Sequence, residues 1–367
     1  MNRIVTLTIC ALAVIASPLR ADPRLPRVFT DHMVIQQQKP INIWGWADKG
    51  EAITVSFSGQ QAATTAGDDG TWMVTLKAAK ATAAPQSMTV KGKTTVTLKD
   101  VLIGEVWFFG RQSAIDISLG KRAPKSASDA PLVRFFSIER CARPEPQTDL
   151  PPKGDLSGGR ILFYPADIEV KERSVNAHGP WRIANNTENV DMSAAAFVYA
   201  RDLSKRLNVP VGIIDVPMGS SVLESWMSPS AVTAAGADEY SYLTGPEKVK
   251  AWDPAEEQAK YETAMVKFKA GLKDQYRQGN GTNKSQPLQP VHPGYLLLST
   301  SGCYNATIWP IRNLGMRGVL LYQGACYPHA PYVDILNKST HLDFIKACNA
   351  YHTSYNYQKF VRRRCRP

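Results

Sequence analysis

The stretch that decides the fold is VLIGEVWFFGRQSAI, residues 101–115. Its apolar residues read as a buried strand that stops at Gly110, and Ser113 follows just beyond the strand's end. A serine on a tight turn after a buried strand is well placed as a nucleophile, because the sheet fixes the backbone and the turn exposes Oγ. The stretch therefore makes Ser113 a candidate nucleophile, and it raises the question of a base and an oxyanion hole.

Two later apolar strands end in the same way. Residues 211–216 (VGIIDV) lead to a turn at Gly219, and residues 318–322 (GVLLY) lead to a turn at Gly324. A helix is predicted directly before the first of them, over residues 192–207, and this alternation is typical of a parallel α/β sheet. Because ligand sites in open α/β sheets lie beyond the carboxyl ends of the strands, we expect the three turns to converge.

The residues before this stretch have a different pattern. Between residues 25 and 101, short segments alternate apolar and polar side chains and are separated by turns, which predicts a small antiparallel β-sandwich. These segments are INIWGWA, AITVSFSG, GTWMVTL, SMTVKG and TTVTLKDV. Trp44, Trp46 and Trp72 lie at alternating strand positions, so packing in the core and at its rim is favoured over a sugar-stacking platform.

Three further elements are predicted between and after the strands. Residues 131–139 (PLVRFFSIE) read as a strand, residues 254–278 as a polar amphipathic helix, and residues 304–314 as a helix. Residues 142–159 and 279–293 read as loops.

The first 21 residues resemble a secretory signal, with an apolar run after Arg3 and cleavage near Ala21. The run is shorter than the ~20 apolar residues that a membrane span needs, so we expect an exported, soluble protein without a membrane span. The whole chain has 367 residues, 44% hydrophobic and 20% charged, which is ordinary for a globular protein of about two domains.

The formal charge of +11 depends partly on the two ends of the chain. No interior segment combines clustered Lys and Arg with aromatic residues, so nucleic acid is not an expected partner. The six cysteines have irregular spacing, which predicts neither a disulfide framework nor a metal site and leaves any disulfide pairing open.

Six blocks of sequence, taken in order, resemble the sialate O-acetylesterases, which are carbohydrate esterases of the SGNH-hydrolase type. The blocks are LPRVFTDHMVIQQQKPINIWGWA, DGTWMVTL, DVLIGEVWFFGRQS, PVGIIDVPMGSSVLESW, YNATIWPI and GVLLYQGA. The resemblance runs from about Leu25 to about Tyr332. It implies a β-sandwich followed by a three-layer, flavodoxin-like parallel α/β domain, and a serine mechanism that needs no cofactor and no metal.

The resemblance also implies roles for particular residues. The family's first turn reads G-Q-S-N-M, and residues 111–115 (RQSAI) match it at Gln112 and Ser113, the nucleophile. Gly219 and Gln323 match positions near the oxyanion, where backbone N–H groups would act. Two further matches, Glu224 and Trp226, would shape the substrate pocket beside Gln112.

The chain departs from the family at several positions. Ala325 replaces a glutamate, Tyr327 replaces an asparagine, and none of the six histidines has an aspartate three residues before it. An SGNH esterase takes its base from such an Asp-x-x-His motif. His329 or His352 could substitute for it. Residues 335–367 lack the expected strand and helix pattern, and we interpret them as an aberrant basic tail on a truncated or frame-disrupted chain.

These observations predict a signal peptide (residues 1–21), a β-sandwich domain (22–103), an incomplete SGNH-hydrolase-like domain (104–334) and the tail. The expected function is hydrolysis of O-acetyl esters on sialic acid or related sugars, with an O-acetylated carbohydrate as substrate. Two alternatives remain: an exported carbohydrate-binding protein without catalysis, and a decayed pseudoenzyme. A glycosidase that uses Asp215 and Glu224 as its two acids is a further interpretation, with no sequence evidence that they meet.

Overall fold

The computed structural model describes residues 23–111, 130–138, 140–152, 180–184, 192–219, 221–234, 250–278 and 299–322, together with residues 247, 287, 290 and 293. The predicted signal peptide and the predicted tail lie outside these residues. Within the described part of the chain, no helix combines the length and the apolar character that crossing a membrane requires.

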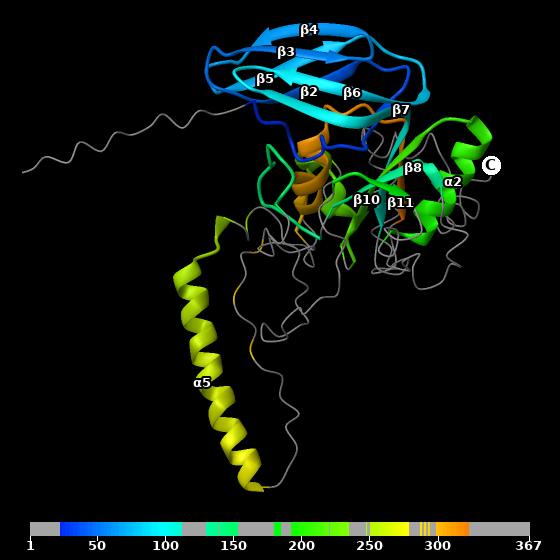
Figure 1. Cartoon of the computed structure of the whole chain (residues 1–367). Helices are drawn as coiled ribbons and strands as arrows, with labels where there is room; N and C mark the ends of the chain where they lie inside the picture. Colours follow the sequence, from blue (N-terminus) through cyan, green and yellow to red (C-terminus); the bar gives the residue numbers. More distant parts are fainter. Residues whose placement is uncertain are drawn as a thin grey trace, which may run out of the picture.

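One long strand, β7 (Thr95–Arg111), connects the two halves of the molecule (Figure 1). Its first residues pair antiparallel with β6 (Thr82–Lys91), and its last residues pair parallel with β10 (Val211–Pro217) and β11 (Gly318–Tyr322). The sequence predicted two strands meeting near residue 101. The structure instead has one continuous strand, which is partly buried before residue 101 and fully buried after it. The later part is buried because it lies in a parallel sheet that is covered on both faces. The predicted domain boundary at residue 103 falls inside β7 and stays a prediction.

The parallel strands form the centre of a mixed sheet in the order β11, β7, β10, β8 (Ala130–Ser137). The short strand β9 (Arg182–Ala184) pairs antiparallel with β8 at the edge. A parallel α/β sheet is therefore present, as the sequence predicts.

Helix α2 (Ala194–Leu207) packs on one face of this sheet. Ser193 caps its first turn, because the Ser193 Oγ accepts a hydrogen bond from the Ala196 N–H at 3.3 Å. The helix ends at Asn208, whose left-handed backbone (φ 53°) stops the helical hydrogen bonding. Phe197 and Ala200 of the helix are buried against the sheet residues Trp107, Phe109 and Ile213.

The opposite face of the sheet is covered by two short elements. Residues 304–311 form a π-helical turn (Tyr304–Ile308) followed by a 3-10 turn (Trp309–Ile311), instead of the predicted helix over 304–314. Pro310 has no N–H to donate, so a regular helix cannot continue through it. Ala306 and Ile311 from these turns are buried in the same core as Phe108 and Val216 of the sheet.

The N-terminal strands from β2 to β6 pair antiparallel, as predicted. β2 (Ile41–Trp46) pairs with β5 (Thr71–Leu76) in a two-stranded sheet, whereas β3 (Ala52–Phe57) pairs with β4 (Gln60–Thr65) and with β6 in the large sheet. A short parallel strand, β1 (Val34–Gln36), joins β7. A separate β-sandwich domain formed by these strands stays a prediction.

The three tryptophans of this region pack as expected. Trp44 and Trp72 are buried in the core, and the Trp44 ring lies edge-on to Phe29 with 4.7 Å between centroids. Trp46 is partly exposed at the rim, where the Arg24 guanidinium lies 4.0 Å from the centre of its ring.

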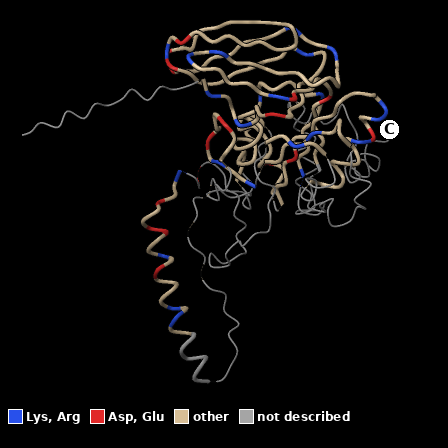
Figure 2. The backbone as a smooth tube through the Cα atoms, in the orientation of Figure 1, with Lys and Arg blue, Asp and Glu red and all other residues tan. Residues whose placement is uncertain are grey.

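Within the described part of the chain, the 3-10 turn η3 (Leu223–Trp226) after β10 is followed by the helices α3 (Pro229–Ala234) and α5 (Pro254–Gln278). The bounds of α5 agree with the predicted helix. Figure 1 shows α5 projecting away from the rest of the molecule, and Figure 2 shows that it carries charges of both signs.

Candidate functional site

The three strands that lead to the predicted turns end side by side. Arg111, the last residue of β7, is paired with Pro217 of β10 on one side and with Tyr322 of β11 on the other. The Met218 N–H donates to the Arg111 carbonyl oxygen at 2.8 Å, which fixes the start of the turn after β10. The ends of the three strands therefore lie together, whereas the convergence of the turns themselves stays a prediction. Gln112, Ser113 and Gln323 follow these ends directly and lie outside the described residues.

A buried ion pair joins two of the strand ends. The Arg111 guanidinium contacts the Asp215 carboxylate through Nε to Oδ1 at 2.8 Å and through Nη2 to Oδ2 at 3.2 Å. The side chains are 1% and 0% exposed. Asp215 is in register with Phe109, two residues before Arg111, so both charged groups lie on the α2 face of the sheet. The glycosidase interpretation needs the Asp215 carboxylate as one of its two acids, and this carboxylate is instead bonded to Arg111.

The end of β7 is tightly packed on its other face at Gly110. A Cβ atom at this position would lie 2.9 Å from Leu321 Cδ1 and 3.1 Å from Trp226 Cζ3. Trp226 is fully buried, and its ring meets Phe108 edge-on with 6.3 Å between centroids. The strand end therefore accepts glycine because a larger residue would displace its neighbours.

A short chain of hydrogen bonds supports the turn that contains Gly219. The Trp226 Nε1–H donates to Ser221 Oγ at 2.9 Å, and the Ser221 hydroxyl donates to the Met218 carbonyl oxygen at 2.7 Å. Gly219 itself is buried. The sequence points to Gly219 and Trp226 but not to Ser221. A serine five residues before a tryptophan is not a recognisable motif.

Glu224 lies in η3 and is fully buried. Its carbonyl oxygen accepts from the Ser301 N–H at 2.9 Å, and the neighbouring Ser225 Oγ accepts from the Cys303 N–H at 3.0 Å. The η3 turn is thus bound to the segment before the π-helical turn. Asn305 extends this support, since its Nδ2 donates to two backbone carbonyls, those of residues 143 and 144. A role for Glu224 or Trp226 against substrate stays a proposal.

The two described cysteines, Cys141 and Cys303, are buried near this turn. The Cys141 N–H points to Met218 Sδ at 3.4 Å. Burial raises the pKa of the Cys303 thiol to about 12. Because the thiolate is the nucleophilic form, Cys303 is not an alternative nucleophile at neutral pH.

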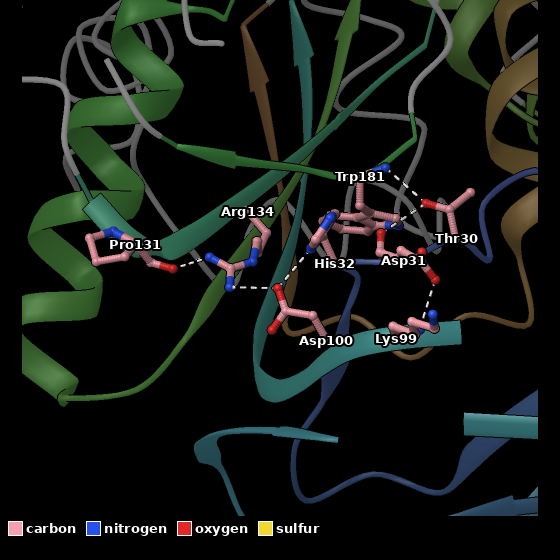
Figure 3. A network of polar contacts seen from close by, with 8 residues as sticks. All are labelled: Thr30, Asp31, His32, Lys99, Asp100, Pro131, Arg134 and Trp181. Atoms are coloured by element: carbon pink, nitrogen blue, oxygen red, sulfur yellow. Dashed lines mark hydrogen bonds and ion pairs between the residues drawn. The ribbon is translucent and has the colours of Figure 1, made fainter. Parts of the chain in front are cut away.

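His32 is the one histidine within the described residues, and Figure 3 shows its surroundings. Its Nδ1 lies 2.7 Å from Asp100 Oδ2, and the Arg134 Nη2 reaches the same oxygen at 3.2 Å. Burial lowers the pKa of the Arg134 guanidinium, and the charge of Asp100 opposes this effect. The network joins the segment before β1 to β7 and β8 (Figure 3).

This histidine lies far from the strand ends. Asp100 precedes Arg111 by eleven positions on β7. The part of β7 that pairs with β10, from Glu105 to Arg111, alone covers roughly 20 Å at about 3.3 Å per residue. His32 therefore does not serve a serine that follows Arg111. Among the described residues, no group of His, Cys, Asp and Glu is arranged to hold a metal ion.

Comparison with known proteins finds relatives that share one name. No family model matches the chain. The chain is 24% identical over 325 residues to the sialate O-acetylesterase of Rattus norvegicus, covering 81% of this chain and 51% of that protein. The Homo sapiens protein of the same name is 24% identical over 244 residues, covering 60% and 43% respectively. The chain thus spans about half the length of the curated relatives it matches.

A solved structure shares the fold. A carbohydrate acetylesterase from Xanthomonas citri superposes with a TM-score of 0.58 at 21% sequence identity, covering 87% of this chain and 56% of that one. At this identity the likeness concerns the fold alone.

Proposed function

We propose that this chain, which is similar to curated sialate O-acetylesterases, is a carbohydrate O-acetylesterase with Ser113 as its nucleophile. The observation that carries the proposal is the register at Arg111, which adjoins both Pro217 and Tyr322. Ser113 follows Arg111 by two residues, so a loop that carries it starts between the two loops that carry Gly219 and Gln323. A nucleophile and its oxyanion donors need this proximity.

The proposed reaction has two steps. Ser113 Oγ attacks the acetyl carbonyl carbon and gives its proton to a base. The tetrahedral intermediate then breaks its bond to the sugar oxygen, which takes this proton from the base and leaves as a sugar hydroxyl. Water then releases acetate from the acetyl-serine by the same route. The N–H groups of Gly219 and Ser113, together with Gln323, would hold the oxyanion. Each such donor typically contributes ~10² to 10³ in rate.

The structure of the turn after β10 supports the part assigned to Gly219. Its preceding residue, Met218, has its N–H bonded to Arg111 and its carbonyl bonded to Ser221. A backbone that is fixed before substrate arrives is what an oxyanion donor needs, since no reorganisation then opposes the reaction. The base is the open part of the mechanism, and His329 and His352 are its candidates in the printed sequence.

The substrate class we propose is an O-acetyl ester of sialic acid or a related sugar, and the place of action is outside the cytoplasm after cleavage near Ala21. Hydrolysis of p-nitrophenyl acetate and of O-acetylated sialic acid by the purified chain tests the first part. Ser113→Ala is expected to abolish both activities. Ser230→Ala, an exposed serine on α3, is the control and should leave both rates unchanged. Equal rates for wild type and Ser113→Ala would overturn the esterase proposal.

A second candidate, carbohydrate binding without catalysis, is favoured by one observation. Arg111 occupies the position of the first glycine in the family's G-Q-S motif and is buried in an ion pair there. Thermal melting with and without O-acetylated sialic acid tests this candidate. A sugar-dependent rise in melting temperature without ester hydrolysis would favour binding. Hydrolysis that depends on Ser113 would refute it.

A further inference from the structure

Helix α5 has an apolar stripe without a described neighbour. Tyr261, Ala264, Met265 and Phe268 recur at the spacing that places side chains on one face of a helix. These four residues are only partly buried. Figure 1 shows α5 projecting from the molecule with none of the described strands or helices beside it. A stripe of this kind is typical of a helix that packs against another helix.

The charges of α5 are separated along its length. Three glutamates, Glu256, Glu257 and Glu262, outnumber one lysine in the first half of the helix. In the second half, four basic residues outnumber the one acidic residue, Asp274; they are Lys267, Lys269, Lys273 and Arg277. Figure 2 shows residues of both signs on the part of the helix nearer the body and basic residues beyond them. If two such helices pack together, the direction in which they run relative to each other decides whether opposite or like charges meet.

The one lysine of the first half, Lys260, is engaged within the helix. Its Nζ contacts Glu256 Oε1 at 2.8 Å and Glu257 Oε1 at 2.7 Å. Hydrogen bonds to these two carboxylates raise the pKa of the Lys260 ammonium. Because one lysine is shared by two glutamates and Glu262 adds a third carboxylate, the first half of α5 remains acidic.

These features select a second copy of the same chain as the partner. In an antiparallel pair, the acidic half of each α5 lies against the basic half of the other, and the stripes face each other across a twofold axis. A parallel pair would place like charges together along the whole contact. We propose that α5 is a dimerisation helix, which pairs antiparallel with α5 of a second copy through the stripe of Tyr261, Ala264, Met265 and Phe268.

Sedimentation velocity of the full chain over a range of concentrations tests the proposal. Phe268→Glu places a charge in the stripe and is expected to raise the dimer dissociation constant by about tenfold or more. Val266→Glu is the matched control, because Val266 is 69% exposed and lies two residues away, on the opposite face of the helix. It should leave the dissociation constant unchanged. A monomeric wild type, or equal effects of the two variants, would overturn the proposal.

Charge reversal tests the antiparallel direction, and it also serves if Phe268→Glu fails to fold. Glu256→Lys with Glu262→Lys makes both halves basic and should weaken the dimer. Adding Lys267→Glu and Lys269→Glu reverses the second half and should restore dimerisation. Persistent weakening in the fourfold variant, with an unchanged circular dichroism spectrum, would contradict the antiparallel arrangement.

Discussion

Arg111 and Asp215 form a buried bidentate ion pair that joins the last residue of β7 to the adjacent strand β10. The pair lies immediately before the segment that carries Ser113. Removing two charges from water costs free energy, and two close contacts with good geometry offset part of that cost. Removing the Asp215 carboxylate therefore takes two close charged contacts from the buried Arg111 guanidinium.

The first prediction concerns this pair. Asp215→Asn should lower the free energy of unfolding by about 3–5 kcal/mol, because it removes the carboxylate charge that contacts the buried Arg111 guanidinium through both of its oxygens. Urea denaturation followed by circular dichroism measures the change. Asp202→Asn is the control, since Asp202 pairs with Arg201 at the surface, where an ion pair contributes about 1 kcal/mol or less. Equal losses in the two variants would show that the buried pair has no special role.

The second prediction concerns Gly110. Gly110→Ala should lower the free energy of unfolding by about 1–3 kcal/mol, because its Cβ would approach Leu321 and Trp226 closer than ordinary packing allows. The measurement is the urea midpoint of the variant against wild type. Adding Leu321→Ala should reduce the loss caused by Gly110→Ala, because it removes the atom nearest to the new Cβ. A neutral Gly110→Ala would mean that the strand end is looser than the structure has it.

The third prediction concerns the hydrogen bonds behind Gly219. Ser221→Ala removes the acceptor of the Trp226 Nε1–H in a fully buried position. Leaving such a donor without its partner costs about 1–3 kcal/mol. Differential scanning calorimetry should therefore show a lower melting temperature for Ser221→Ala than for Ser230→Ala. A melting temperature equal to that of the control would contradict the supporting role of Ser221.

The fourth prediction concerns pH. Burial raises the pKa of Cys303 in the folded chain from its ordinary value of 9.0 to about 12. Its contribution to stability is therefore complete below pH 9 and is lost as the pH rises towards 12, because the unfolded chain releases the proton first. Relative to Cys303→Ala, wild type should lose about 1.4 kcal/mol per pH unit between these values. A pH-independent difference in unfolding free energy between the two proteins would refute this.

Much of the fold follows from the pattern of the sequence. The bounds of β10 and β11 agree with short apolar runs, and those of α5 agree with a polar amphipathic pattern that begins at a proline. β4 was missed because its sequence, QQAATT, has no large apolar residue to alternate. Its partner β3 supplies the pairing. Such tertiary pairing is not visible in a local pattern.

The site was predictable only in outline. Three apolar strands with glycine-bearing turns predict a candidate site at their carboxyl ends, because the ends of parallel strands share one edge of the sheet. The structure places these strand ends side by side, and the site itself stays a prediction. The contact between Arg111 and Asp215 was not foreseen, although both residues were noted. Arg111 stands where the family's G-Q-S motif has a glycine, and it lies more than 100 positions from Asp215 in the sequence. Only the register of β7 and β10 brings them together.

The central claim is that Ser113 is the nucleophile of an esterase. The most direct measurement is mass spectrometry of the full chain after treatment with a serine-reactive organophosphorus ester, followed by peptide mapping. The account predicts one adduct, on the peptide that contains Ser113, and its absence in Ser113→Ala. An unmodified Ser113 in a folded chain, or an adduct that persists in Ser113→Ala, would contradict it.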